Sequence, residues 1–592
     1  MRDAVRVCSR SPFRGDSRSV LLSLVLLWSG CAPQAATDKL EKSLREQADQ
    51  QAESRILRNL QNAMEGLRPE KLGIASGPEQ AIAVLNEWAK GAKAEAEKRG
   101  EGWEPHRPHD LLKSLPKEWI EQVSLEHFVG RDAMYLRDCL WASKATKFAA
   151  GDAEKDLDVV VNLFDYVIRN VVLTPPRSRR APMGPFDVMV LGRGTAVDRA
   201  WVFAELLRQR NVDSVILSPR RPAGEAEAAS DENFLVGVLF EKDILLFDPT
   251  LGLPLTADAA DPKSALPRLP MSLRQAQRDP NLLAAIAHDS GEKFTLTAAM
   301  LEAPQVELIC HSEQLSIRMK RLQQELSGEN SLIVSDLLED SEDQPGLWSR
   351  VAKHPAAAWS ADDVAIWPYP EIVRESAMRM TPEQQKEILK LSQSLAAPVR
   401  LQRFLTKPDG RSFDLEFAKP ERIMMKRRME QVMGRWSDVV PGYLAAQLYD
   451  VDPPTAKGLQ IVSPDGKQKD DLSIVSATES RSLRLMLMQP EYENVRKLHL
   501  LAGDDACFWL ALCQFEQNRL QAAVDQCVVY ANQHSSGGWV TANQSLMAMA
   551  LVKLKKLKPA IRALKEIDED DPASGGHRVL MARWQRLLEA AE

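Results

Sequence analysis

The side chains with the clearest potential for chemistry lie at the start of one predicted helix, in the segment 192–210. Thr195 carries a hydroxyl, and Asp198 follows three residues later. This spacing is typical of a capping box, in which the two side chains cover free N–H groups of a helix end. It predicts a helix that begins at Ala196. The hydroxyl of Thr195 would then lie at the positive end of the helix, where a nucleophile can be activated.

A nucleophile also needs a base, and the sequence restricts the choice. The chain has no Cys between Cys139 and Cys310 and no His between His127 and His288. The reactive groups left for this segment are Thr195, Asp198 and Asp248. Without an imidazole or an amine base, a Thr hydroxyl stays protonated and is a weak nucleophile.

The elements that would position these residues follow one another closely. Apolar residues recur at three- and four-residue steps after the helix start, at Val197, Ala200, Trp201, Ala204 and Leu207. One helix face should therefore be buried. Three runs rich in β-branched or aromatic residues come next and are typical of strands: 214–219, 233–240 and 243–250. We expect an α+β fold in which the helix packs on a small antiparallel sheet, flanked by largely helical regions.

A glycine turn, a helix, a strand, and a strand that ends in Asp-Pro-Thr together resemble the core of the transglutaminase-like family, whose fold belongs with the papain-like thiol enzymes. In that family the helix start has the pattern G-x-C-x-D-x-A, a middle strand carries His, and the Asp of the D-P-T segment orients the His. The resemblance implies a transglutaminase-like domain over residues 151–260.

The catalytic pair of the family is missing from this segment. In GTAVDRA, Ala196 stands where the family has Cys. The position of the family His falls at Asn233, within a residue or two, and only Asp248 keeps the expected type. The resemblance therefore implies a degenerate site, with Thr195 as the one alternative nucleophile.

Residues 1–30 are predicted to be an export signal. Five arginines precede the apolar run 20–28, which is too short to span a bilayer comfortably. Ser29-Gly30-Cys31 resembles the lipobox of bacterial lipoproteins, which implies lipidation of Cys31, although Trp28 stands where Leu is usual. An ordinary cleaved signal and an uncleaved anchor are the alternatives. We expect an exported, membrane-attached protein on the periplasmic face of a bacterial cell envelope.

Residues 31–68 are predicted to form a lipid attachment site and an amphipathic helical stalk. The helix expected over 36–67 either spaces the body from the membrane or pairs with another helix, and its polar middle weakens the case for a long coiled coil. Residues 69–150 are expected to be helical, with helices at 78–99 and 132–149.

Extended and helical signals alternate in residues 271–440 and predict a second small mixed α/β layer, followed by helices. The extended signals are 294–300, 306–312 and 331–337, and a helix is expected over 313–326. Residues 441–499 are expected to hold a linker, at 453–469, and a helical segment.

Residues 500–592 contain an internal repeat with an offset of 37 residues. Ala511 aligns with Ala548, and the other matched pairs are Leu520 with Leu557 and Ala523 with Ala560. This resembles a pair of tetratricopeptide repeats, whose period is about 34. A plain antiparallel bundle is the alternative. Repeats of this kind imply a protein partner.

Composition narrows the function further. A net charge of −7 over 592 residues provides no basic stripe for nucleic acid. Beyond the signal region the Cys count is odd and irregularly spaced, which is neither a disulfide framework nor a metal site, and we expect no cofactor. The sequence favours a non-catalytic binding or scaffold module with helical repeats. The alternatives are a weakly active transglutaminase- or peptidase-type hydrolase and a regulatory subunit of an active relative.

Overall fold

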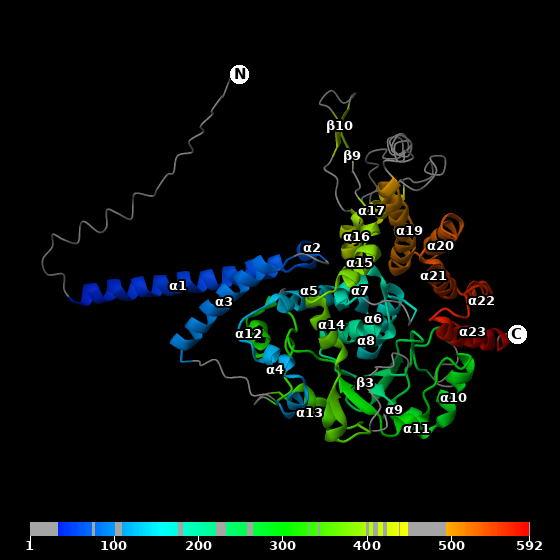
Figure 1. The fold of residues 1–592 in the computed structure, drawn as a ribbon, viewed down its shortest axis with the longest axis horizontal. Helices are drawn as coiled ribbons and strands as arrows, with labels where there is room; N and C mark the ends of the chain where they lie inside the picture. The colour runs from blue at the N-terminus through cyan, green and yellow to red at the C-terminus, as the bar shows by residue number, and fades with distance from the viewer. Residues whose placement is uncertain are drawn as a thin grey trace.

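The computed structural model describes most of the chain after the expected signal (Figure 1). The described residues are 34–73, 77–100, 109–175, 181–220, 233–256, 264–328, 331–340, 344–397, 402–406, 413–417, 423–436, 439–447 and 493–590. The expected signal, Cys31 and the expected linker at 453–469 lie outside these ranges. Among the described helices, none is long and apolar enough to cross a membrane.

One six-stranded sheet organises the body, in the order β6-β5-β4-β3-β7-β8. Its strands are β3 (Ser214–Ser218), β4 (Leu235–Leu239), β5 (Ile244–Asp248), β6 (Leu253–Pro254), β7 (Gln305–Leu308) and β8 (Val364–Ile366). The three strands expected from the sequence are confirmed, and they pair antiparallel, with Ile216 opposite Val236 and Phe247 opposite Val236 on the other side. The expected antiparallel pairing holds for these three strands, but the sheet as a whole is mixed, because β8 pairs with β7 in parallel.

The second mixed layer expected after residue 271 does not form. Val215 pairs with Leu308, so β7 extends the same sheet, and the backbone groups at the edge of β3 are satisfied. Two other extended signals are not strands. Residues 294–300 run into the short helix α11 (Ala298–Leu301), which Thr297 caps, and 331–337 is irregular chain held by the Gln323 side chain.

One face of the sheet is covered by α8 (Ala196–Arg208), together with α5 (Gly130–Ala150), α6 (Asp156–Asn170) and α7 (Pro185–Leu191). Phe164, Phe203 and Phe247 meet between α6, α8 and β5, with ring centroids 5.0–5.3 Å apart. The predicted start of α8 at Ala196 is confirmed. The sequence did not predict α7, a buried helix that begins with a proline at Pro185.

The opposite face packs on a second core. It is formed with α9 (Leu273–Arg278), α10 (Pro280–Asp289), α11, α13 (Leu347–Ala352) and helices from the C-terminus. The expected helix over 313–326 is shorter and forms α12 (Ile317–Glu325). Further elements of the body are β1 (Val172–Leu173) and β2 (Arg193–Gly194), which pair in parallel, and α2 (Pro69–Leu72), η2 (Asp110–Ser114), α4 (Lys117–Ser124), η5 (Ala361–Asp363), α14 (Tyr369–Met378), α15 (Pro382–Leu391), η6 (Ser394–Ala396), β9 (Gln402–Thr406), β10 (Phe413–Phe417), α16 (Ile423–Gln431) and α17 (Val439–Gln447).

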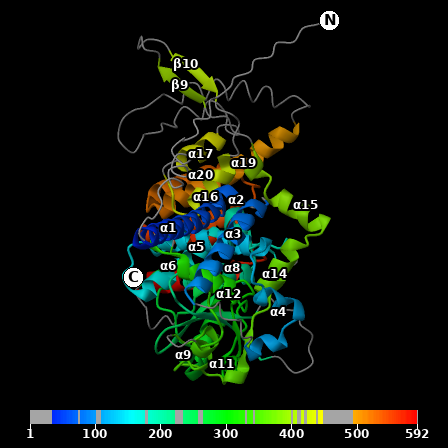
Figure 2. The same cartoon turned by 90° about the vertical axis from the view of Figure 1, so that its left-hand side faces the viewer.

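The predicted N-terminal helix forms α1 (Gln34–Gly66) and pairs with α3 (Glu79–Lys98) along one side of the molecule (Figures 1 and 2). The pair is antiparallel, because Gly66 contacts Ala81 and Gly91 contacts Ile56. Small residues allow this approach: a Cβ on Gly91 would lie 2.9 Å from Ile56 Cγ1. Of the two options open from the sequence, the structure shows pairing with another helix.

Five C-terminal helices form successive hairpins: α19 (Glu493–Glu516), α20 (Leu520–Gln533), α21 (Val540–Lys553), α22 (Leu557–Lys565) and α23 (Ser574–Glu589). The offset of 37 residues recurs in their geometry. Leu520 and Leu557 each begin a helix, and two residues earlier Asn518 and Lys555 adopt left-handed φ angles of 57° and 62°. The two hairpins therefore turn in the same way.

Candidate functional site

The start of α8 is built on two glycines that allow close packing. Gly192 ends α7 with a left-handed φ of 70°, a conformation that glycine adopts without cost. A Cβ on Gly194 would lie 3.0 Å from both Asp198 Cβ and Val188 Cγ1. A larger residue at position 194 would have to displace these side chains, so glycine favours the close approach of the helix start to α7.

Thr195 and Asp198 form the predicted capping box. The Thr195 hydroxyl donates to Asp198 Oδ2 at 2.9 Å, and the Thr195 N–H donates to the same oxygen at 2.8 Å. Tyr369 donates its hydroxyl to Asp198 Oδ1 at 2.6 Å. Both Thr195 and Asp198 are 6% exposed. The hydroxyl of Thr195 is thus buried and already hydrogen bonded, which is the arrangement of a helix cap.

Ala196 occupies the first position of α8. Arg199, one turn further along, donates from Nη1 to the carbonyl of Pro249 at 2.9 Å, and Pro249 directly follows β5. The first turn of α8 and the Asp-Pro-Thr turn are therefore in contact. Ala196 presents only a methyl group there.

Asp248 stabilises the turn after β5. Its Oδ1 accepts hydrogen bonds from the N–H groups of Thr250 at 2.7 Å and Leu251 at 2.9 Å. Burial raises the pKa of Asp248 to about 6, and the two N–H donors and Arg199 only partly oppose this shift. The carboxylate binds its own backbone turn and orients no imidazole among the described residues.

Asn233 lies at the same end of the sheet but has a different environment. The antiparallel register of β4 and β5 brings the start of β4 beside the end of β5. Asn233 lies two residues before β4, and Asp248 is the last residue of β5. The Asn233 side chain is exposed and accepts a hydrogen bond from the Thr295 hydroxyl. The strand register brings the backbone of Asn233 near that of Asp248, and their side chains form no pair of nucleophile and base.

The sequence did not reveal a buried ionic network around His311, which follows β7. His311 Nδ1 lies 2.8 Å from Glu313 Oε2, and its Nε2 lies 3.7 Å from Glu205 Oε1 on α8. Arg131 bridges Glu313 and Glu371 at 2.8 and 2.7 Å. A histidine from outside the 151–260 segment therefore reaches α8, which no local signal could indicate.

This network is too far from the helix start to serve Thr195. Glu205 is nine residues after Ala196, which is about 13 Å along the helix. His311 is also only 2% exposed. Burial opposes ionisation of Glu205 and Glu313, but Arg208 and His311 beside Glu205, and Arg131 and His311 beside Glu313, hold the pKa of each carboxyl below its ordinary range. The network consists of compensated charges that join α5, α8 and α14.

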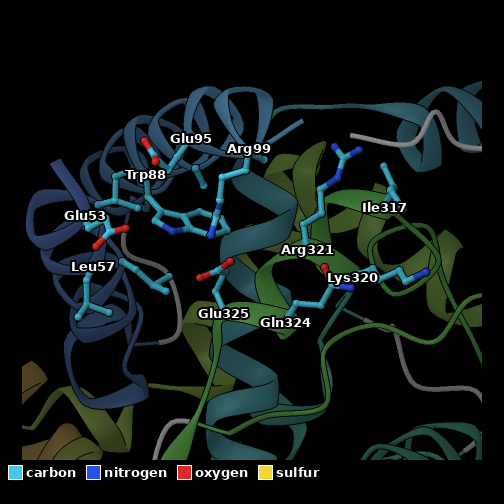
Figure 3. Close-up of a pocket in the computed structure, with 14 residues that line it drawn as sticks. Glu53, Leu57, Trp88, Glu95, Arg99, Ile317, Lys320, Arg321, Gln324 and Glu325 are labelled. Carbon is cyan, nitrogen blue, oxygen red and sulfur yellow. The ribbon is translucent and has the colours of Figure 1, made fainter. Parts of the chain in front are cut away.

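A large open groove lies between the antiparallel pair of α1 and α3 and helix α12 (Figure 3). It has a volume of about 500 Å³, and Trp88, Leu57 and Ile317 supply apolar surface along it. Both signs of charge line it, with Arg99 and Lys320 on one hand and Glu53 and Glu325 on the other. None of the residues predicted from the sequence as site residues lies in this groove.

Side chains with metal-binding chemistry are dispersed. Over the described ranges, no group of three or more His, Cys, Asp or Glu residues is placed to hold a metal ion. The cysteines of these ranges are buried thiols: Cys139, Cys310, Cys507, Cys513 and Cys527.

The fold defines the chain as an α+β protein with a small mixed sheet between helical layers. Comparison with protein-family models, with curated proteins and with solved structures gave no match.

Proposed function

We propose that the chain is an exported cell-envelope protein, attached to the membrane by lipid at Cys31, in which a transglutaminase-like domain acts as a non-catalytic binding or scaffold module. The helical repeats at the C-terminus would bind a protein partner. The observation that carries the proposal is the start of α8, where Ala196 replaces a nucleophile and Asp198 holds the hydroxyl of Thr195.

Several contacts support a transglutaminase-like scaffold without its reaction. The hydrogen bond from Arg199, in the first turn of α8, to the carbonyl of Pro249 in the Asp-Pro-Thr turn supports the arrangement that the resemblance implies. Acyl transfer needs a nucleophile and a base within hydrogen-bond reach. The Thr195 hydroxyl caps a helix and the Asp248 carboxylate caps a turn, so neither group is available as the nucleophile or the base.

The hydrolase alternative requires Thr195 to leave its capping box. The test is turnover of glutamine-containing peptides with an amine donor, and of a peptide library, by the purified protein. We expect none, and we expect Thr195→Ala to give the same blank result as the wild type. Turnover by the wild type that disappears in Thr195→Ala would contradict the proposal.

Lipid attachment has its own test. We expect the wild-type protein to partition into the detergent phase and Cys31→Ala to move to the aqueous phase, because the acyl chains supply the membrane affinity. Cys139→Ala is the matched control, since Cys139 is buried in the body and should not affect partitioning. Equal partitioning of wild type and Cys31→Ala would argue against a lipid anchor.

A further inference from the structure

A cavity of about 130 Å³ lies between the sheet-bearing body and the C-terminal helices. Residues from α6, from the turn after β5, and from α19, α21 and α23 line it. Ile168, Leu253, Phe508 and Met549 supply apolar walls, and Arg199 and His577 bring polar groups to the same space. The segments that meet here are far apart in the sequence, so the cavity exists only in the folded chain.

Arg199 is a buried cation with little compensation. It is 4% exposed, and its Nε and Nη1 donate to the carbonyls of Val171 at 2.8 Å and Pro249 at 2.9 Å. A guanidinium has five N–H donors. No carboxylate of the described residues lies within ion-pair distance of it. Burial lowers the pKa of Arg199 to about 9, although the charges of Asp571 and Asp248 oppose this shift.

Arg428 shows how a buried arginine is otherwise satisfied in this fold. It is 0% exposed, and it donates to the carbonyls of Met189, Val190 and Asn170 and to the side chains of Asn170 and Gln431. Arg428 does not line the cavity. The difference between the two arginines indicates that Arg199 keeps donors for a group that enters the cavity.

A second polar pair lies on the same cavity wall. Ser545 donates its hydroxyl to the carbonyl of Thr541 at 2.9 Å and lies 2.8 Å from His577 Nε2. His577 Nδ1 is buried and has no hydrogen-bond partner within the described part of the chain. Burial lowers the pKa of His577 to about 4, and the nearby charge of Arg199 adds to this shift, so the imidazole is neutral at pH 7.

From this arrangement we propose that the cavity binds a small organic carboxylate with an apolar body. The carboxylate pairs with Arg199, and the body packs on the walls that include Ile168 and Met549. Asp165 and Asp571 also line the cavity, which disfavours a phosphate dianion. This site is independent of the protein partner proposed above.

The same carboxylate could come from a short fatty acid or from an apolar amino acid, whose ammonium group would face Asp571. The test titrates the full chain with hexanoate, with leucine and, for comparison, with inorganic phosphate, and measures heat and the thermal midpoint. We expect saturable binding of hexanoate or leucine and none of phosphate. The acid that binds identifies the source.

Two variants separate this site from general effects. Arg199→Met should weaken binding by about tenfold or more, because the ion pair is lost. Arg428→Met should lower the thermal midpoint and leave the affinity unchanged. If Arg199→Met does not fold, Ala542→Leu, which narrows the cavity, should abolish binding instead. Absence of binding by the wild type, or equal affinity in Arg199→Met or Ala542→Leu, would overturn the proposal.

Discussion

The buried carboxylate of Asp248 is compatible with two different roles. In a thiol enzyme it would orient an imidazole, whereas here its Oδ1 accepts two backbone N–H groups of its own turn. Asparagine offers the same acceptor oxygen without the charge. The pKa of Asp248, raised to about 6, makes the two roles distinguishable by experiment.

We predict that Asp248→Asn stabilises the protein at neutral pH. The unfolded chain releases the proton near pH 3.8 and the folded protein near pH 6, so this group makes the wild-type free energy of unfolding fall as the pH rises through that window. Relative to wild type, the variant should change little at pH 4 and gain about 1–3 kcal/mol at pH 7. Urea unfolding at both pH values measures this difference.

The control for this variant is Asp152→Asn, because Asp152 is exposed. We expect it to leave the free energy of unfolding unchanged at both pH values. A loss of stability in Asp248→Asn at pH 7 would show that the charge itself stabilises the turn.

For single residues, the sequence predicted hydrogen bonds within one helical turn but not contacts between residues far apart in the chain. The capping box of Thr195 and Asp198 needs only two residues in one helical turn, and the structure contains it. The contact between Glu205 and His311 joins residues that are about 100 positions apart, and it depends on β7 pairing with β3. No spacing rule covers such a contact.

Among the C-terminal helices, α20 offers exposed apolar side chains to a partner, as does α19 at Leu500 and Leu501. Val528 and Val529 are 48% and 37% exposed, next to a helix face that is buried at Ala523 and Cys527. Exposed neighbouring apolar residues on a helical hairpin are typical of a binding surface. We therefore place the proposed protein partner at this part of the repeats.

Replacing both valines by Asp should abolish capture of the partner from an envelope extract, because a charge would be buried in the interface. Asn532→Asp, on the same helix and exposed, should leave capture intact. Both variants should retain the wild-type thermal midpoint. A partner that is still captured by the double variant would show that the surface lies elsewhere.

Elements with long periodic patterns were predicted well, since α1, α3, α5 and α8 lie within two residues of their expected starts. The assignment of strands to layers failed. The segment 306–312 has a strand pattern, but such a pattern does not indicate which strand it pairs with. In the structure, β7 pairs with the edge of β3 that β4 leaves open, and so it extends the first sheet. The sequence also did not predict the direction of β8, because its parallel pairing with β7 depends on the long connection between the two strands.

At the scale of the molecule, the C-terminal helices complete both cores. Trp509 and Trp539 are 1% and 2% exposed and belong to the core beneath α8, and Trp584 belongs to the core on the other face of the sheet. Arg193, just before α8, lies over Trp539 with its guanidinium carbon 4.1 Å from the ring centroid. The C-terminal helices therefore share both cores with the rest of the protein.

We predict that a chain without residues 493–592 does not reach the native fold. The loss exposes apolar residues of both cores, each of which contributes about 1.5–3 kcal/mol by burial. Thermal unfolding should show no cooperative transition, and a dye for apolar surface should bind. A chain without residues 34–50 is the control. It should keep the wild-type midpoint, because the described side chains of this part of α1 are exposed.

The position of Trp584 has a consequence for synthesis. Its indole N–H donates to the carbonyl of Ala265 at 2.7 Å, so a residue of α23 closes the second core against a segment 319 positions earlier. A ribosome makes this tryptophan only after the six strands of the sheet have been produced. A message that stops early yields a polypeptide with an open core, which cellular proteases can recognise. The second core therefore stays open during synthesis until α23 has been made.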